Sequence, residues 1–298
     1  MAGKNMNYFL MDGIANGRIK CTIANWTGVA YRIPRVKLVD CKNIDYLKQS
    51  GVYFLFSKGV SGKPLVYIGQ AGTRKNGEGI LNRLKEHHAS PKQGLEDWYE
   101  AIAFATSNNI FGATEISWLE NRFFALAAGA NRYEAKNGNE PNAGNVTEEK
   151  ESELEEYVEY AKIVMGVLGH MVFEPLSTPP VAIAESDENM TTTVIELEIK
   201  QGEVMSFGQR SSDGFVVLKG SKIRTSVAPS CPKNAKKQRE MNASRIDSDG
   251  VLTEDILFNS ANEAACFVIG GSISGIMAWK TSAGKSLKEV ETSEAAEL

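Results

Sequence analysis

Two nearly continuous apolar segments lie close together in the first quarter of the chain, and they limit its possible folds more than any other feature. Residues 51–56 (GVYFLF) and 65–69 (LVYIG) are separated by a glycine-containing turn over residues 58–64. Valine, isoleucine, phenylalanine and tyrosine favour strands, and short apolar runs without polar alternation are typical of strands buried on both faces. The sequence therefore predicts a hairpin whose two strands are largely buried.

Weaker patterns surround this hairpin. The first fifty residues contain short alternating stretches punctuated by glycines, which predict a β-rich N-terminal extension. Residues 79–88 and the segment that starts near Thr114 have apolar positions at helical spacing, and the apolar residues 101–105 predict a third strand between them. A further helix is predicted to begin at Thr147, which can cap it, because acidic residues follow in the first turn.

A proline-containing polar stretch divides the chain. Residues 174–193 include three prolines and an acidic segment without apolar periodicity, so we expect a linker. A chain of 298 residues is long enough for about two domains. We predict an α+β protein with the extension at 1–50, an α/β domain at 51–173 that ends in the acidic helix, and a smaller α+β domain at 194–298. The last residues, 286–298, are small, polar and acidic, and we expect them to be frayed.

The charge is distributed unevenly along the chain. Residues 1–140 carry 18 basic and 12 acidic side chains, whereas residues 141–200 carry 3 and 13, and residues 201–298 carry 12 of each. One acidic block, most of it on a predicted helix face, therefore masks a basic N-terminal part. Binding to a polyanion depends on the local field, so the net charge of -4 permits a nucleic-acid partner. Residues 233–245 form a second basic cluster, which is either a solvated loop or a contact with nucleic acid.

Several classes of protein are excluded. No stretch approaches the ~18 consecutive apolar residues that a membrane helix needs. The cysteines lie far apart without a CxxC pair, and three histidines are too few for a Cys/His zinc cluster. We therefore expect a soluble cytoplasmic protein with no membrane partner and with buried, reduced cysteines at positions 21, 41, 231 and 266.

The polar residues in and after the hairpin form a more specific pattern. They are, in chain order, Gly51-Val52-Tyr53, Tyr67-Ile68-Gly69, Arg83 and His87 one helical turn apart, and Glu120 in the next strong helix. Over residues 51–145 this order resembles the GIY-YIG nuclease superfamily, with the second tripeptide intact and the first present as Gly-Val-Tyr. The resemblance implies a metal-dependent endonuclease, a phosphodiester hydrolase that acts on DNA.

The resemblance also implies a role for each of these side chains. Tyr53 or Tyr67 would help to activate the attacking water, and the sequence leaves open which one. Arg83 would offer a planar fork of donors to phosphate oxygens, and His87, on the same helix face, could accept a proton. Glu120 would hold the metal, Mg²⁺ with Mn²⁺ as the alternative, because hard cations prefer oxygen ligands.

Four further residues are candidates for substrate binding. Gly69 leaves space for a close backbone approach. Asn137 occupies the position where similar proteins often have an asparagine. Residues 72–79 form a longer segment than in compact members of the superfamily, and Arg74 and Lys75 within it could contact phosphate.

Outside this core the chain resembles a bacterial subgroup of the superfamily. The similarity lies in residues 25–28 (NWTG), in the glutamate-rich helix, and in residues 215–221 and 245–280, which resemble a C-terminal domain of unknown function. Relatives act in repair, restriction, mobile-element homing and defence, so foreign or structured DNA is the expected substrate. One alternative is a catalytically idle nucleic-acid-binding module with the same fold, and another is a scaffold that binds proteins through the acidic helix.

Overall fold

The computed structural model describes residues 3–59, 62–73, 79–92, 94–137, 145–177 and 195–296. The chain divides into two compact units, Met1–Glu174 and Pro175–Leu298. Both units combine helices with sheet, which confirms the α+β class. Most of the predicted linker, residues 178–193, lies outside the described residues, as do Arg74 and Lys75. None of the helices described combines the length and the hydropathy of a membrane span.

Seven strands form one sheet in the described part of the N-terminal unit, in the order β1-β2-β3-β6-β4-β5-β7. Neighbours are antiparallel except β5 and β7, which are parallel. The strands are β1 (Met6–Leu10), β2 (Ile19–Ile23), β3 (Gly28–Pro34), β4 (Gly51–Ser57), β5 (Leu65–Ala71), β6 (Glu100–Thr106) and β7 (Glu134–Lys136). The strands of the first fifty residues thus belong to the same sheet as the hairpin.

The predicted hairpin is confirmed and lies inside this sheet. Every residue of β4 is buried, and β4 pairs with β5 on one side and with β6 on the other. Its register places Tyr53 opposite Gly69 and Leu55 opposite Tyr67. Because side chains alternate along a strand, both tyrosines point to the same face.

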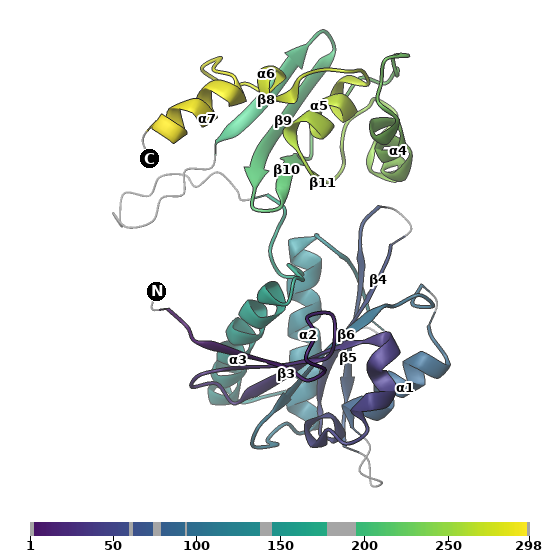
Figure 1. The fold of residues 1–298 in the computed structure, drawn as a ribbon, viewed down its shortest axis with the longest axis vertical. Helices are drawn as coiled ribbons and strands as arrows, with labels where there is room; N and C mark the ends of the chain where they lie inside the picture. Colours follow the sequence, from purple (N-terminus) through teal and green to yellow (C-terminus); the bar gives the residue numbers. More distant parts are fainter. Residues whose placement is uncertain are drawn as a thin grey trace. The chain divides into compact units, whose positions relative to one another are not determined.

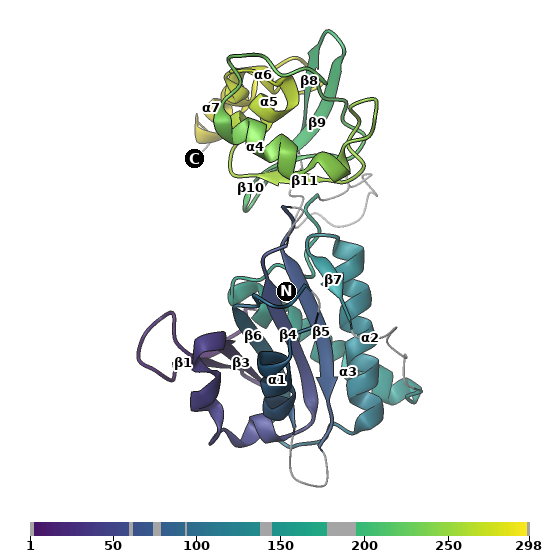
Figure 2. The same cartoon turned by 90° about the vertical axis from the view of Figure 1, so that its right-hand side faces the viewer.

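Helices cover both faces of the sheet (Figures 1 and 2). The helix α1 (Ile80–Ala89) and the short 3-10 helices η1 (Arg35–Cys41) and η2 (Asp45–Lys48) pack on the face that carries Tyr53 and Tyr67. The helices α2 (Ala113–Ala130) and α3 (Glu148–Val167) pack on the other face, against Phe54 and Ile68. As predicted, Thr147 caps α3, since its hydroxyl accepts a hydrogen bond from the Lys150 amide.

The C-terminal unit has its own sheet and core. Four strands are ordered β11-β10-β9-β8 among the described residues, and they pack against α5 around Phe215, Phe267 and Trp279. Its elements are β8 (Glu196–Gln201), β9 (Val204–Ser211), β10 (Gly214–Val217), α4 (Lys233–Met241), η3 (Ala243–Arg245), β11 (Ile256–Phe258), α5 (Ala261–Ile269), α6 (Gly275–Ala278) and α7 (Leu287–Ala296). The four cysteines of the chain are buried and free, as expected.

The helix α7 corrects one expectation, because residues 287–296 are helical where a frayed end was predicted. Ser286 and Glu289 form a capping box: the Ser286 amide donates to the Glu289 carboxylate, and the Glu289 amide donates to the Ser286 hydroxyl. Leu287 and Val290 are buried. The Ser-x-x-Glu spacing is present in the sequence, but the small, polar composition of the segment conceals it.

Candidate active site

Two tyrosines and a histidine form a buried cluster on the α1 face of the sheet. The hydroxyl of Tyr53 lies 2.9 Å from Nε2 of His87. The ring centroids of Tyr67 and His87 are 5.0 Å apart, and those of Tyr53 and Tyr67 are 6.2 Å apart. None of the three residues is more than 3% exposed. The structure therefore brings together three of the predicted catalytic residues.

Gly69 makes this packing possible. A Cβ atom at this position would lie 2.5 Å from the Tyr53 hydroxyl oxygen and 2.9 Å from Cε1 of Tyr67. Real side chains do not approach so closely, so any other residue would displace the two tyrosines. Gly69, which was predicted to leave space for substrate, therefore allows the two tyrosine rings to pack beside the strand.

Arg83 lies one helical turn before His87 and extends toward solvent. Its guanidinium forms an ion pair with Glu86, and its side chain is 36% exposed. Its charge and a hydrogen bond to Tyr53 act to lower the pKa of that tyrosine, but burial dominates and holds the pKa well above its usual value. A pocket of about 250 Å³ adjoins the guanidinium and is lined by residues 70–72, Gly79, Asn82, Arg83 and Glu86.

Burial also determines the charge state of His87. Removal of its ring from water, together with the positive charges of Arg83 and Lys92, lowers the pKa of His87 to about 4. The imidazole is therefore neutral at pH 7. In the tautomer with its proton on Nδ1, Nε2 accepts the hydrogen bond that the Tyr53 hydroxyl donates.

Glu120 approaches β5 from the other face of the sheet. Gln70 follows Gly69 in β5, so its side chain points toward α2, and its Nε2 donates to Oε2 of Glu120 at 2.9 Å. Glu120 is 8% exposed. Burial raises the pKa of this carboxyl, whereas hydrogen bonds from Gln70 and Asn137 and the charge of Lys92 act to lower it. The predicted metal ligand and the predicted Asn137 thus lie together.

The two groups of residues lie on opposite faces of the sheet at an edge where β5 has no strand partner among the described residues. The strand β7 pairs with β5 only at residues 65–67. Beyond Tyr67, no other strand among those described covers this side of β5. The tyrosine–histidine cluster on one face and Glu120 on the other therefore lie on either side of residues 68–71. The charge of Glu120 accordingly acts to raise the pKa of Tyr53.

Lys92 and Gln70 belong to the site but were not predicted from the sequence. The ammonium of Lys92 donates to the Tyr67 hydroxyl at 3.0 Å and lies 5.0 Å from that ring's centroid. Its charge affects the pKa values of both His87 and Glu120. Nothing in its sequence context marks this lone lysine, whereas the alternation along β5 could have placed Gln70 on the face opposite Tyr67.

The residues around Glu120 suit a hard cation. Within the described ranges, no group of three or more histidine, cysteine, aspartate or glutamate side chains converges. Glu120 instead provides one carboxylate, and the amide side chains of Gln70 and Asn137 are beside it. Mg²⁺ usually binds one or two carboxylates and retains several waters, so the single carboxylate of Glu120 fits the ion.

The C-terminal basic cluster is smaller than the sequence suggested. Arg239 donates hydrogen bonds to the backbone carbonyls of Phe267, Arg224 and Val268, and Arg245 is 8% exposed with its guanidinium bonded to Asn242. Both arginines therefore stabilise the fold. The exposed members of the cluster on α4 are Lys233, Lys236 and Lys237.

Comparison with known proteins reaches only the C-terminal unit. The family model described as Domain of unknown function (DUF4357) matches residues 197–291. Neither the comparison with curated proteins nor that with solved structures gives a significant match. The match agrees with the C-terminal domain of unknown function expected from residues 215–221 and 245–280, and we conclude that the C-terminal unit is similar to that family.

Proposed function

We propose that the N-terminal unit is a metal-dependent endonuclease of the GIY-YIG type that hydrolyses phosphodiester bonds in DNA. The observation that carries this proposal is the placement of two groups on opposite faces of β5, beside the part of its edge that β7 does not pair with. Tyr53, Tyr67 and His87, with Arg83 beside them, lie on one side, and Glu120 lies on the other. Phosphodiester hydrolysis needs a phosphate ligand, a proton acceptor and a way to neutralise charge, and these groups supply all three.

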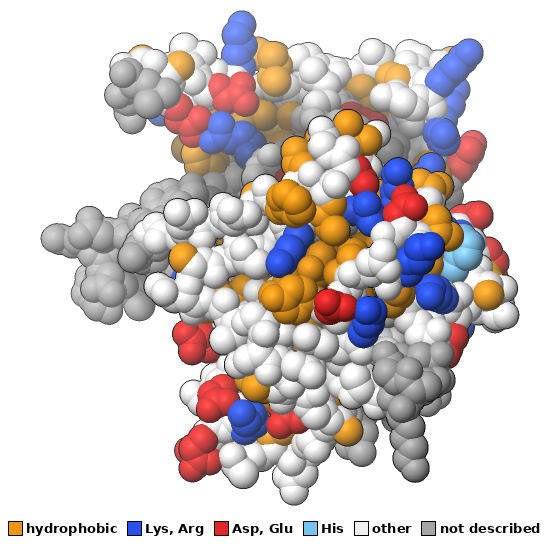
Figure 3. All heavy atoms as spheres, turned by 60° about the horizontal axis from the view of Figure 1, so that its bottom comes forward, with side chains coloured by type: hydrophobic (Ala, Val, Ile, Leu, Met, Phe, Trp, Pro, Cys, Tyr) orange, Lys and Arg blue, Asp and Glu red, His pale blue; other side chains and the backbone are white. Residues whose placement is uncertain are grey.

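Arg83 is the group suited to hold the phosphate. Its guanidinium is permanently charged, partly exposed and adjacent to a pocket. A phosphate in this pocket would compete with Glu86 for the guanidinium, and it offers two oxygens to the planar fork. On the face drawn in Figure 3, lysine and arginine side chains lie around a hydrophobic patch, with some acidic side chains among them.

The two tyrosines differ in their suitability as proton acceptor. Burial holds the pKa of Tyr53 well above its usual value, and its hydroxyl is engaged with His87. The hydroxyl of Tyr67 instead accepts a hydrogen bond from the Lys92 ammonium, which orients that oxygen. We assign water activation to Tyr67, with Tyr53 and His87 fixing its ring. A divalent ion bound at Glu120 would polarise the phosphate and stabilise the departing oxygen.

A second candidate is the catalytically idle nucleic-acid-binding module. It is favoured by one observation, the nearly complete burial of Tyr53, Tyr67 and His87. A binding module tolerates buried hydroxyls, whereas an enzyme needs at least one of them to reach the attacking water.

One experiment separates the two candidates. The full chain is incubated with labelled single-stranded, duplex and branched DNA and with RNA, in Mg²⁺, Mn²⁺ or EDTA. We expect cleavage of at least one DNA substrate with either metal and none with EDTA, because phosphate neutralisation depends on the ion. Binding to DNA without cleavage under every condition would contradict the nuclease and support the binding module.

The lysines of α4 give a second prediction about DNA. If the C-terminal unit contacts phosphate, replacing Lys233, Lys236 and Lys237 by glutamine should weaken DNA binding and reduce the slope of log affinity against log salt by up to about 3. Replacing three exposed lysines elsewhere in the same unit, Lys219, Lys285 and Lys288, is the matched control. Equal effects of the two triple variants would show that only overall charge matters and that α4 is no contact site.

A further inference from the structure

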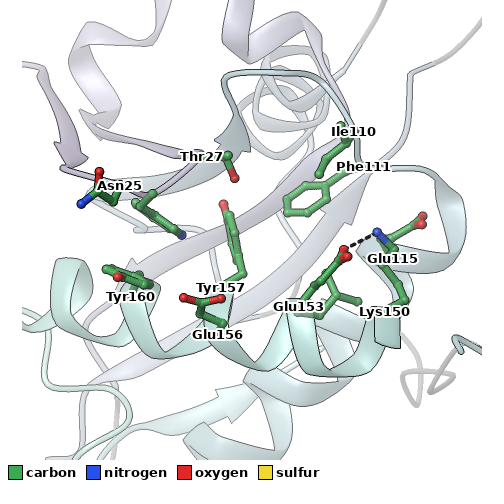
Figure 4. Close-up of a pocket in the computed structure, with 12 residues that line it drawn as sticks. Asn25, Thr27, Ile110, Phe111, Glu115, Lys150, Glu153, Glu156, Tyr157 and Tyr160 are labelled. Atoms are coloured by element: carbon green, nitrogen blue, oxygen red, sulfur yellow. Dashed lines mark hydrogen bonds and ion pairs between the residues drawn. The ribbon is translucent and has the colours of Figure 1, made fainter. Parts of the chain in front are cut away.

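The N-terminal unit contains a second pocket that the nuclease proposal does not use. Its volume is about 260 Å³, and its walls are residues 25–27, the side chains of Ile110, Phe111 and Glu115, and the side of α3 that carries Tyr157 and Tyr160 (Figure 4). The Tyr157 hydroxyl donates to the carbonyl of Ala105 in β6, two strands from β5 in the sheet. This second pocket shares no lining residue with the pocket at Arg83.

Aromatic rings form one wall of this pocket. The ring centroid of Trp26 lies 5.0 Å from that of Tyr157 and 5.9 Å from that of Tyr160, with the Trp26 and Tyr160 planes 16° apart. Phe111 packs against Tyr157 edge to face at 5.0 Å. Phe111 and Tyr157 are buried, and the Tyr157 hydroxyl is held by its hydrogen bond, so this part of the wall is fixed before any ligand arrives.

The segment Asn25-Trp26-Thr27-Gly28 is shaped to present the indole. Asn25 has a left-handed backbone with φ of 62°. A Cβ atom on Gly28 would lie 2.0 Å from Cζ2 of Trp26, so the ring rests directly on the Gly28 backbone. The indole Nε1 is buried and has no hydrogen-bond acceptor among the described residues.

The ionisable groups of the pocket carry a negative charge. Three carboxylates, those of Glu115, Glu153 and Glu156, line it with a single ammonium, that of Lys150. Lys150 pairs with Glu153 at 2.5 Å, and Glu115 accepts a hydrogen bond from the Gly112 amide. Within the described part of the chain, exposed Glu156 has neither a hydrogen bond nor an ion pair. Such a site repels phosphate and attracts a cation.

One ring of this wall, that of Tyr160, contacts the ammonium group of Lys4, which does not itself line the pocket. Nζ of Lys4 lies 4.0 Å from the ring centroid of Tyr160, within cation–π distance. We propose that the pocket binds an organic cation, an ammonium or guanidinium head on a short apolar stem. The head would face the rings and Glu156, and the stem would contact Phe111 and Ile110. Both a free quaternary ammonium compound and a lysine or arginine side chain have this chemistry.

Choline and 3,3-dimethylbutan-1-ol test the proposal, because they share a shape and differ in charge. The readout is the indole N–H signal of Trp26 in NMR spectra of the full chain, assigned with Trp26→Phe. We expect a saturable shift with choline and at least about fivefold weaker binding of the neutral alcohol. n-Butylguanidinium and n-butylammonium resemble the ends of arginine and lysine side chains. If either binds more tightly than choline, the ligand is a side chain. If both bind more weakly than choline, the ligand is a quaternary ammonium compound.

Glu156→Gln should weaken choline binding by about fivefold, because it removes the unpaired carboxylate while leaving the rings in place. Glu151→Gln, which neutralises an exposed glutamate of the same helix outside the pocket, is the matched control and should have no effect. Equal binding of choline and the alcohol, no saturable shift with any probe up to tens of millimolar, or a saturable shift with a DNA dinucleotide instead would each overturn the proposal.

Discussion

Glu120→Gln is expected to reduce DNA cleavage by roughly 10³-fold while leaving DNA binding intact. The substitution keeps the shape of the side chain and an oxygen that can accept the hydrogen bond from Gln70. It removes the charge that would hold the ion. Cleavage is measured under single-turnover conditions in Mg²⁺, and binding is measured in Ca²⁺ or EDTA. Glu115→Gln on the same helix, which retains the oxygen that caps Gly112, is the matched control.

Thermal unfolding gives a readout of this site that does not depend on activity. Burial raises the pKa of Glu120 in the folded state. At a pH above this pKa, the buried ionised carboxylate therefore lowers the free energy of unfolding. This loss of stability disappears as the pH falls through the folded-state pKa. In EDTA, Glu120→Gln should therefore raise Tm at neutral pH and lose this advantage in acid. Mg²⁺ should raise the Tm of the wild type but not of the variant. A wild-type cleavage rate for Glu120→Gln would contradict the proposed site.

Tyr67→Phe is expected to slow cleavage by roughly 10²-fold or more, and by more than Tyr53→Phe does. Both substitutions keep the ring packing and remove one hydroxyl, so each should cost only about 1 kcal/mol of unfolding free energy through the lost hydrogen bond. The Tyr67 hydroxyl is the one that accepts from the Lys92 ammonium. Single-turnover rates and melting curves of the two variants are compared at the same pH.

Lys92→Gln tests the reason for this order. Without the ammonium, the Tyr67 oxygen loses the donor that orients it, so cleavage should slow by roughly tenfold. Lys85→Gln, an exchange of a lysine on α1 outside the cluster, should leave the cleavage rate unchanged. A larger loss for Tyr53→Phe than for Tyr67→Phe, with an unchanged rate for Lys92→Gln, would assign water activation to Tyr53 instead.

The arginines of α4 and η3 show a limit of composition as evidence. In the sequence, Arg239 and Arg245 belong to the same basic cluster as three lysines. The structure uses the Arg239 guanidinium to satisfy three backbone carbonyls and buries Arg245 beside Asn242. A guanidinium carries several donors in a plane, so it can satisfy the ends of several chain segments, and charge alone does not reveal this use.

The sequence by itself determined those features that depend on neighbours within a few residues. Apolar runs specified β4 and β5, and helical spacing put Arg83 and His87 on one side of α1. Local side-chain periodicity is fixed by the backbone geometry of each element, so it can be predicted from short windows.

The tertiary structure decided which faces and edges meet. Glu120 reaches β5 from the face opposite the tyrosines, through Gln70, and Lys92 joins both groups from a loop. The strand β7 pairs with β5 only at residues 65–67, and among the described strands none pairs with the next part of this edge. Pairings between residues 25 to 69 positions apart depend on the packing of all elements at once, because each strand has the same backbone donors and acceptors. No periodicity in the sequence could have indicated them.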